Sequence, residues 1–185
     1  MECILCTEPG HVRMAKALRY SVYCEEKRWI DPRQCVDGIE EDGDDELAIH
    51  FLALEDGHPV GTARLLLGKH QKLPASEYID LTAIGVDETQ IAEISRLAIR
   101  RHSRSYDLRV FLNLMQAMWS WGSDNSMLVA LAIADAPLFT GLQRLGIPTL
   151  ATTPEVEFLG SSCVPVAFEV SSLGEWCQRR LGNGE

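Results

Sequence analysis

Two charged side chains lie inside apolar segments of this chain, and each restricts how the chain can fold. Arg64 lies near the end of the apolar run 60–66, and Glu93 lies within the run 91–99. Apolar runs of this length are typical of strands. An unpaired buried charge costs several kcal/mol by order of magnitude. The fold therefore has to bring a partner or a substrate to both side chains.

The run 60–66 is preceded by a second apolar run, 48–54, and the turn between them contains Gly57. This pattern predicts an antiparallel hairpin. The acidic segment 31–45 is predicted to be a loop, and 91–99 a strand. The other expected elements are strands over 2–6, 127–134, 156–158 and 164–170, and helices over 11–27, 106–121 and 137–145. The order of elements predicts an α/β fold with a mixed central sheet flanked by helices.

Composition limits the classes of function. The chain has 185 residues, 46% of them hydrophobic and 24% charged, which predicts a single globular domain over 1–185. No apolar run is long enough to span a membrane, and the start of the chain lacks the basic residues of a signal peptide, so we expect a cytoplasmic protein. The net charge of -10 argues against nucleic acid as a partner.

The six cysteines are expected to be free thiols, because a disulfide framework belongs to secreted chains. The spacing Cys3-x-x-Cys6 raises the possibility of a metal site. However, no second Cys or His pair follows at a ligand spacing, and residues three apart on a strand face opposite sides. Buried structural thiols and no metal are therefore expected.

Charged and aromatic residues recur in a fixed order along the first 105 residues. An arginine is followed four residues later by an aromatic residue and ten residues later by a tryptophan, and acidic residues precede the strand start 50–52. The sequence then contains a Gly-x-x-Arg-Leu strand and a Glu-x-Ser-Arg strand. The residues in question are Arg19, Tyr23, Trp29, Asp42, Asp44, Asp45, Gly61, Arg64, Leu65, Glu93, Ser95 and Arg96.

This pattern resembles the acyl-homoserine-lactone synthases and the N-acyl amino acid synthases, two branches of the GNAT acyltransferase fold. The resemblance implies a GNAT-like fold and transfer of a fatty acyl group from acyl carrier protein to the amine of an amino acid or similar acceptor. Tyr23 and Leu97 stand where the lactone synthases often have phenylalanine, and His50 looks more like the amino acid branch. Two alternatives remain: a lactone synthase that uses S-adenosylmethionine, and a non-catalytic module that binds acyl groups or the carrier protein.

Acyl transfer to an amine needs a base, and the candidate is Glu93, acting directly or through a water. Ser95 and Arg96 complete the set of candidate catalytic residues that the resemblance implies. In a regular strand Glu93 and Arg96 face opposite sides, whereas a bulge between them would bring both to one site.

The acceptor site is expected to involve Arg19, Tyr23, Trp29, Asp42, Asp44, Asp45 and Arg64. The charged members predict an ion network that leaves one arginine for a substrate carboxylate. The alternative is that they form ordinary surface pairs and that Trp29 belongs to the core. Four further side chains, Met115, Met118, Trp119 and Trp121, are predicted to be core rather than the lining of an acyl channel.

The donor is expected to be an acyl-phosphopantetheine thioester on acyl carrier protein, with no tightly bound cofactor. The Gly-rich turn that binds the pyrophosphate of coenzyme A in GNAT proteins is absent from 100–105. Arg100, Arg101 and Arg104 instead offer positive charge to an acidic carrier. The alternative is a solvated basic cluster.

Overall fold

The structure is a computed structural model that describes residues 1–102 and 104–182. Its chain divides into two units. The first unit consists of residues 1–65 and 96–118, and the second of residues 66–95 and 119–185.

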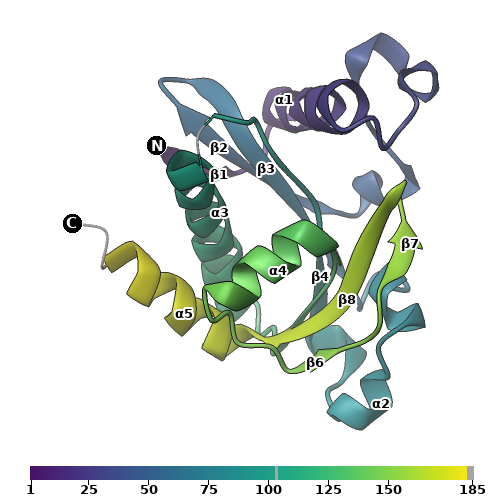
Figure 1. The fold of residues 1–185 in the computed structure, drawn as a ribbon, viewed down its shortest axis with the longest axis vertical. Helices are drawn as coiled ribbons and strands as arrows, with labels where there is room; N and C mark the ends of the chain where they lie inside the picture. The colour runs from purple at the N-terminus through teal and green to yellow at the C-terminus, as the bar shows by residue number, and fades with distance from the viewer. Residues whose placement is uncertain (103, 183–185) are drawn as a thin grey trace. The chain divides into compact units, whose positions relative to one another are not determined.

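The first unit is built on strands that are hydrogen-bonded in the order β1-β2-β3-β4 (Figure 1). Their bounds are Glu2–Leu5 for β1, Ile49–Glu55 for β2, His58–Leu67 for β3 and Ile91–Ile99 for β4. β2 pairs antiparallel with both β1 and β3. The later residues of β3 and the earlier residues of β4 belong to the second unit.

The predicted hairpin is confirmed. Glu55 pairs with His58, and the two residues between them, Asp56 and Gly57, have φ of 51° and 78°. Two successive positive φ values are typical of the type I′ turn, whose twist matches that of the flanking strands. The turn therefore sets the pairing next to it, and the register shifts by one residue between Ala53 and Leu54.

The first helix is shorter than predicted. α1 (Pro9–Tyr20) begins with proline in its first turn, where a missing N–H costs nothing. The next six residues, Ser21–Glu26, form a π-helix. The prediction of one regular helix over 11–27 was therefore wrong in its last turns, because a π-helix widens the turn and changes which side chains share a face.

The two faces of the first unit are covered by different helices. A Cβ added to Gly61 of β3 would meet Val110 of α3 (Arg104–Asp124) at 2.5 Å, so the glycine allows α3 to pack closely. Arg64 lies three residues further along β3 and faces the opposite side. On that side it meets the charged residues beneath α1, and α1 itself contacts β2.

The second unit has both parallel and antiparallel pairs. β5 (Val129–Asp135) runs parallel to β4 and antiparallel to β8 (Ser161–Glu169). Two short strands, β6 (Ala151–Thr152) and β7 (Val156–Phe158), pair with β8. The mixed α/β fold predicted from the sequence is confirmed.

Helices of the second unit include α2 (Leu81–Ile84), α4 (Ala136–Arg144) and α5 (Val170–Gly182). The predicted strand 164–170 ends one residue too late, because Val170 begins α5. The buried positions 170, 173, 174 and 177 have helical spacing, so the sequence contained a signal for α5. Serine and glycine, which are poor helix formers, interrupt this pattern and weaken the signal.

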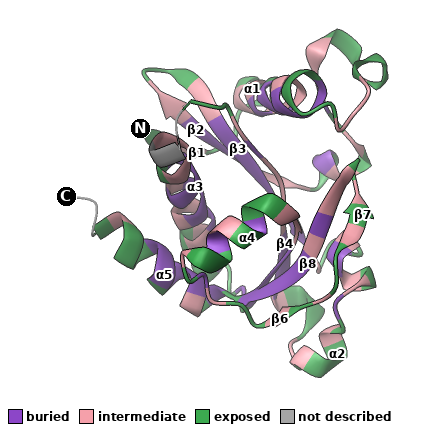
Figure 2. Cartoon of the chain, viewed as in Figure 1, coloured by how far each residue is buried: buried purple, intermediate pink, exposed green. Residues whose placement is uncertain are grey.

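Figure 2 shows buried residues concentrated on the strands and on part of α3, whereas α2 is exposed or half-buried. Met115 and Met118 are buried, as core residues are. A Cβ on Gly174 of α5 would collide with the indole of Trp119, so this glycine lets the helix lie against the ring. Within the described residues, none of the helices has the length and apolar character needed to cross a membrane.

Candidate active site

Arg19, in the last turn of α1, is a buried arginine whose guanidinium donates to two acidic residues. Its side chain is 1% exposed. Nη1 and Nη2 donate to the two carboxylate oxygens of Asp45 at 2.7 and 2.9 Å. Nε donates to the carboxylate of Glu40, and Nη2 also donates to the Glu40 carbonyl, at 2.9 Å. Arg19 therefore fastens α1 to the acidic segment that precedes β2.

That acidic segment is held in shape by its own backbone. The Asp42 N–H donates to the side chain of Asp45 at 3.0 Å, and the Asp44 N–H donates to the side chain of Asp42 at 3.1 Å. These bonds cap the short 3₁₀ helix Gly43–Glu46. The cap orients Asp42 and Asp45 toward the arginines, while the Asp44 side chain stays 42% exposed.

Arg64 of β3 joins the same carboxylates and is 1% exposed. Nη1 donates to Asp42 at 2.6 Å and to Asp45 at 2.8 Å, and Asp44 lies 3.8 Å from Nη2. His50 is paired with Arg64 across β2 and β3, and its Nε2 lies 3.4 Å from the Asp45 carbonyl oxygen. The buried Nδ1 of His50 has no hydrogen-bond partner among the described residues.

Arg96 of β4 completes the network. Nη2 donates to Asp42 at 2.5 Å and Nε donates to Glu40 at 3.1 Å. Its side chain is 10% exposed, more than those of the other two arginines. Arg96 has φ of 49°, and the pairing of β4 with β5 ends at Ile94. A positive φ inside a strand is typical of a bulge. That a bulge brings Glu93 and Arg96 to one site stays a prediction.

We refer to Arg19, Glu40, Asp42, Asp45, Arg64 and Arg96 as the ion network. Glu40 is the member that the sequence analysis missed, although it bridges Arg19 and Arg96 and is 3% exposed. Nothing in its acidic surroundings distinguishes it from its exposed neighbour Glu41. Each of the three guanidinium groups bonds to carboxylates of the chain. That one arginine also holds a substrate carboxylate stays a prediction.

Electrostatics of the network favour the ionised forms. Burial would raise the pKa of Asp45, but the hydrogen bond and charge of Arg19 outweigh this effect, so the pKa is lowered. The pKa of Asp42 is lowered too, because the hydrogen bond from Arg64 and the charge of Arg96 outweigh burial. For His50 burial prevails and lowers the pKa, so the imidazole is stabilised in its neutral form.

Tyr23 and Trp29 lie close together in the first unit, with ring centroids 5.5 Å apart. The Tyr23 hydroxyl donates to the Leu97 carbonyl at 2.8 Å, and burial raises the pKa of this phenol. Tyr23 packs with Leu18 and Ala98, and Trp29 is half-buried against this cluster. These contacts fit the core packing that the sequence analysis kept as the alternative for Trp29.

Glu93 belongs to the part of β4 that lies in the second unit. It is 2% exposed, and the Ala75 N–H donates to its Oε2 at 2.8 Å. Ala75 is in the short 3₁₀ helix Pro74–Glu77, so that turn holds the carboxylate in position. Ser95, two residues further along β4, is half-buried.

The predicted donor residues lie just after β4. Arg100 and Arg101 are both exposed. Arg104 begins α3, but its side chain lies outside the described part of the structure. An exposed arginine keeps its hydration and is available to a charged partner.

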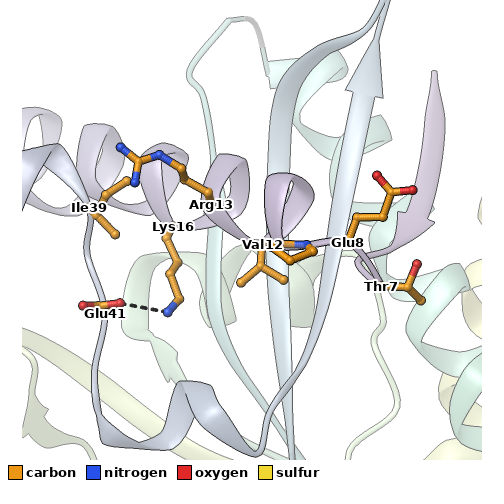
Figure 3. Close-up of a pocket in the computed structure, with 8 residues that line it drawn as sticks. Thr7, Glu8, Val12, Arg13, Lys16, Ile39 and Glu41 are labelled. Atoms are coloured by element: carbon orange, nitrogen blue, oxygen red, sulfur yellow. Dashed lines mark hydrogen bonds and ion pairs between the residues drawn. The ribbon is translucent and has the colours of Figure 1, made fainter.

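A shallow pocket of about 480 Å³ opens along α1 in the first unit (Figure 3). Its lining comprises Thr7, Glu8, Pro9, Val12, Arg13, Lys16, Ile39 and Glu41. None of the residues predicted from the sequence lines this pocket. Lys16 connects it to the ion network, because Nζ lies 2.9 Å from Glu41 and 3.9 Å from Asp45.

The cysteines are free thiols. Cys3 and Cys6 are half-buried rather than buried as predicted, and burial raises the pKa of each thiol to about 11. Within the described residues, no group of three or more His, Cys, Asp or Glu side chains has the arrangement of a metal site.

The sequence of the chain matches a known family. The sequence profile of the N-acyl amino acid synthase FeeM matches residues 14–133 of the chain. This chain belongs to the FeeM family. The matched residues include the whole ion network and Glu93, and the family match identifies the protein as an acyl-transferring enzyme. No curated protein sequence matches the chain significantly.

Solved structures show the same fold as this FeeM-family chain. The acyl-homoserine-lactone synthase LasI is 20% identical with a TM-score of 0.70, covering 91% of this chain and 90% of LasI. FeeM itself, from uncultured soil microbes, is 14% identical with a TM-score of 0.69, covering 95% and 91%. BjaI, a CoA-dependent lactone synthase solved with SAM and isopentyl-CoA, is 23% identical with a TM-score of 0.69, covering 94% and 82%.

Proposed function

We propose that this FeeM-family protein is an N-acyltransferase that moves a fatty acyl group from an acyl carrier protein thioester to the amine of an amino acid or amino-acid-like acceptor. The observation that carries the proposal is the family match over 14–133, because that segment contains both Glu93 and the ion network. The reaction forms one C–N bond, breaks the C–S bond of the thioester, and releases the carrier's thiol.

Glu93 is the proposed base. An amino acid reaches the enzyme as an ammonium ion, which has to lose a proton before its nitrogen attacks the thioester carbonyl. A carboxylate that is buried and held by the Ala75 N–H has a fixed position, which suits proton transfer directly or through one water. Ser95 and Arg96 remain candidate catalytic residues because the family pattern Glu-x-Ser-Arg contains them.

The ion network is proposed to build the acceptor side. Arg19 and Arg64 hold Asp42 and Asp45 in place, so their role is architectural. Arg96, which is the most exposed of the three arginines, is the member proposed to face a substrate. Tyr23 and Trp29 are proposed to supply an aromatic wall, and Asp44 supplies exposed negative charge beside Arg64.

Acyl carrier protein is the proposed partner. The pyrophosphate of coenzyme A is bound by a glycine-rich turn in GNAT proteins, and 100–105 contains no glycine. Acyl carrier protein has an acidic surface and a single phosphopantetheine phosphate, which exposed arginines can attract. Arg100, Arg101 and Arg104 are the proposed contact residues. The acyl-phosphopantetheine thioester is then a co-substrate rather than a bound cofactor.

A direct assay tests the proposal. The purified protein is incubated with a long-chain acyl carrier protein and a panel of amino acids, and products are identified by mass spectrometry. We expect thiol release coupled to an N-acyl amino acid. If folded protein raises thiol release with none of the acceptors, the proposed function is wrong.

Lactone synthesis is the second candidate, and the likeness to LasI and BjaI favours it. In that reaction S-adenosylmethionine would be the acceptor and the product would contain a lactone ring. Including S-adenosylmethionine in the same panel separates the two candidates, because the masses of an acyl lactone and an acyl amino acid differ.

A further inference from the structure

Two cysteines in the first unit lie close enough to react with each other. The Sγ atoms of Cys24 and Cys35 are 3.6 Å apart, although the residues are eleven positions apart in the sequence. Cys24 lies in the π-helix Ser21–Glu26, and Cys35 lies between two 3₁₀ turns. Among the described residues, they are the only two cysteines in contact. An S–S bond is about 2.05 Å long, so the sulfurs need to approach by about 1.5 Å.

The two thiols close the base of a loop that the ion network already holds. Arg19 lies five residues before Cys24, and Glu40 lies five residues after Cys35. Arg19 bonds to Glu40, and the Glu40 N–H donates to the Lys16 carbonyl at 3.3 Å. The segment that ends at Arg19 and the segment that begins at Glu40 are thus bonded to each other. These bonds hold the two thiols close together independently of the conformation of residues 25–34.

The thiols differ in accessibility. Cys24 is buried, and burial raises the pKa of its thiol to about 12. Cys35 is half-buried, so a small oxidant reaches its sulfur first. When the more accessible of two neighbouring thiols is oxidised to a sulfenic acid, the other thiol can attack that sulfur and release water.

We propose that Cys24 and Cys35 are a redox-sensitive dithiol that hydrogen peroxide converts into a reversible disulfide, which fastens the loop 25–34 at its base. In the first step Cys35 sulfur attacks the peroxide O–O bond, giving a sulfenic acid and one water. In the second step Cys24 sulfur attacks that sulfenic acid, forming the S–S bond and releasing a second water. Two thiols are oxidised and one peroxide is reduced to two waters.

The disulfide acts on the acceptor side of the proposed active site, and this part rests on the proposed function. Cys24 directly follows Tyr23, and Trp29 is inside the closed loop. The Trp29 N–H donates to the Tyr23 carbonyl at 2.9 Å, so movement of Cys24 toward Cys35 carries the aromatic pair with it. Displacing this wall should weaken acceptor binding and leave donor binding unchanged.

Peptide mapping tests the site without any activity assay. The protein is treated with a small excess of hydrogen peroxide, alkylated and digested with trypsin. The arginines and lysines of the sequence place Cys24 in peptide 20–27 and Cys35 in peptide 34–64. We expect the two peptides to be linked, with a rise in Tm of roughly 5 °C that dithiothreitol reverses. Absence of the linked peptide in oxidised, folded protein would overturn the proposal.

Two variants complete the test. Cys35→Ser should lose both the linked peptide and the Tm rise, whereas Cys6→Ser, which removes another half-buried thiol, should keep both. In the acyl transfer assay, oxidised wild type should show a severalfold higher KM for the acceptor, and Cys35→Ser should not respond to peroxide. An unchanged KM in protein shown to be oxidised would refute control of the acceptor site. A failure of all transfer activity in the reduced protein, which nevertheless forms the disulfide on oxidation, would instead count against the proposed function.

Discussion

Arg64 and Arg100 lie in the same unit, but their guanidinium groups have opposite surroundings. Arg64 is 1% exposed and bonds to Asp42 and Asp45, whereas Arg100 is exposed just after β4. A buried charge that has been removed from water needs its partners for the fold to be stable. An exposed charge has little effect on folding and is available for a partner. The sequence motif does not show whether an arginine stabilises the fold or is available to bind a partner, whereas its burial does.

The largest expected effect is on stability and comes from the buried arginine. Arg64→Ala should lower the free energy of unfolding by about 3–5 kcal/mol, because it removes one of the two arginines that hold each of the carboxylates of Asp42 and Asp45 and leaves only Arg96 and Arg19 to pair with them. Urea denaturation followed by circular dichroism measures this change. The control is Arg33→Ala, since Arg33 is exposed and pairs with Asp31 on the surface. Equal losses in the two variants would show that burial does not separate the two kinds of arginine.

The next effect is on catalysis without loss of the fold. Glu93→Gln keeps an oxygen that accepts from the Ala75 N–H but removes the base, so kcat should fall by about a hundredfold or more. Steady-state kinetics and an unfolding curve measure the two quantities on the same sample. Glu77→Gln, at an exposed carboxylate that pairs with Lys72, should leave both unchanged. Near-normal turnover in Glu93→Gln would make this carboxylate structural.

A smaller effect is expected from pH. Burial lowers the folded-state pKa of His50, so the unfolded chain binds the proton more tightly and stability falls as the pH drops below about 6.5. The folded state lowers the pKa of Asp42 and Asp45, so both carboxylates stabilise the fold above about pH 4. This stabilisation is lost as the pH falls further and the carboxylates are protonated.

Urea midpoints at several pH values between 7.5 and 3.5 should therefore fall in two stages. His50→Gln should remove the first stage and leave the second. A midpoint that stays constant from pH 7.5 to pH 5 would show that His50 is not held neutral by the fold.

The smallest effect is expected from the exposed arginines. Arg100→Glu with Arg101→Glu should raise the KM for acyl carrier protein severalfold and leave stability nearly unchanged, and added salt should weaken wild-type turnover in the same direction. Arg33→Glu with Arg179→Glu changes the net charge equally at other exposed positions. If both double variants raise KM alike, only net charge matters. If kcat/KM is the same for carrier-bound and coenzyme A thioesters, the basic cluster is only a solvated surface.

The local elements were predictable because local rules specify them. The turn at Asp56 and Gly57 follows from backbone conformation alone, and β4 was predicted over the residues it occupies, 91–99. The family resemblance also came from spacing along the sequence. The π-helix 21–26 was not predictable in this way, because its hydrogen-bond pattern is not marked by any residue type.

The sequence by itself determined which charges need partners, since Arg64 and Glu93 stand in runs too apolar to be left solvated. Only the tertiary structure decided what those partners are. It brought Glu40 between Arg19 and Arg96, and Cys24 to within 3.6 Å of Cys35. The physical reason is that burial and pairing depend on residues far apart in the sequence. The spacing of residues along the chain indicates which charged side chains need a partner. The packing of α1 and the acidic segment against the sheet determines which residue becomes that partner.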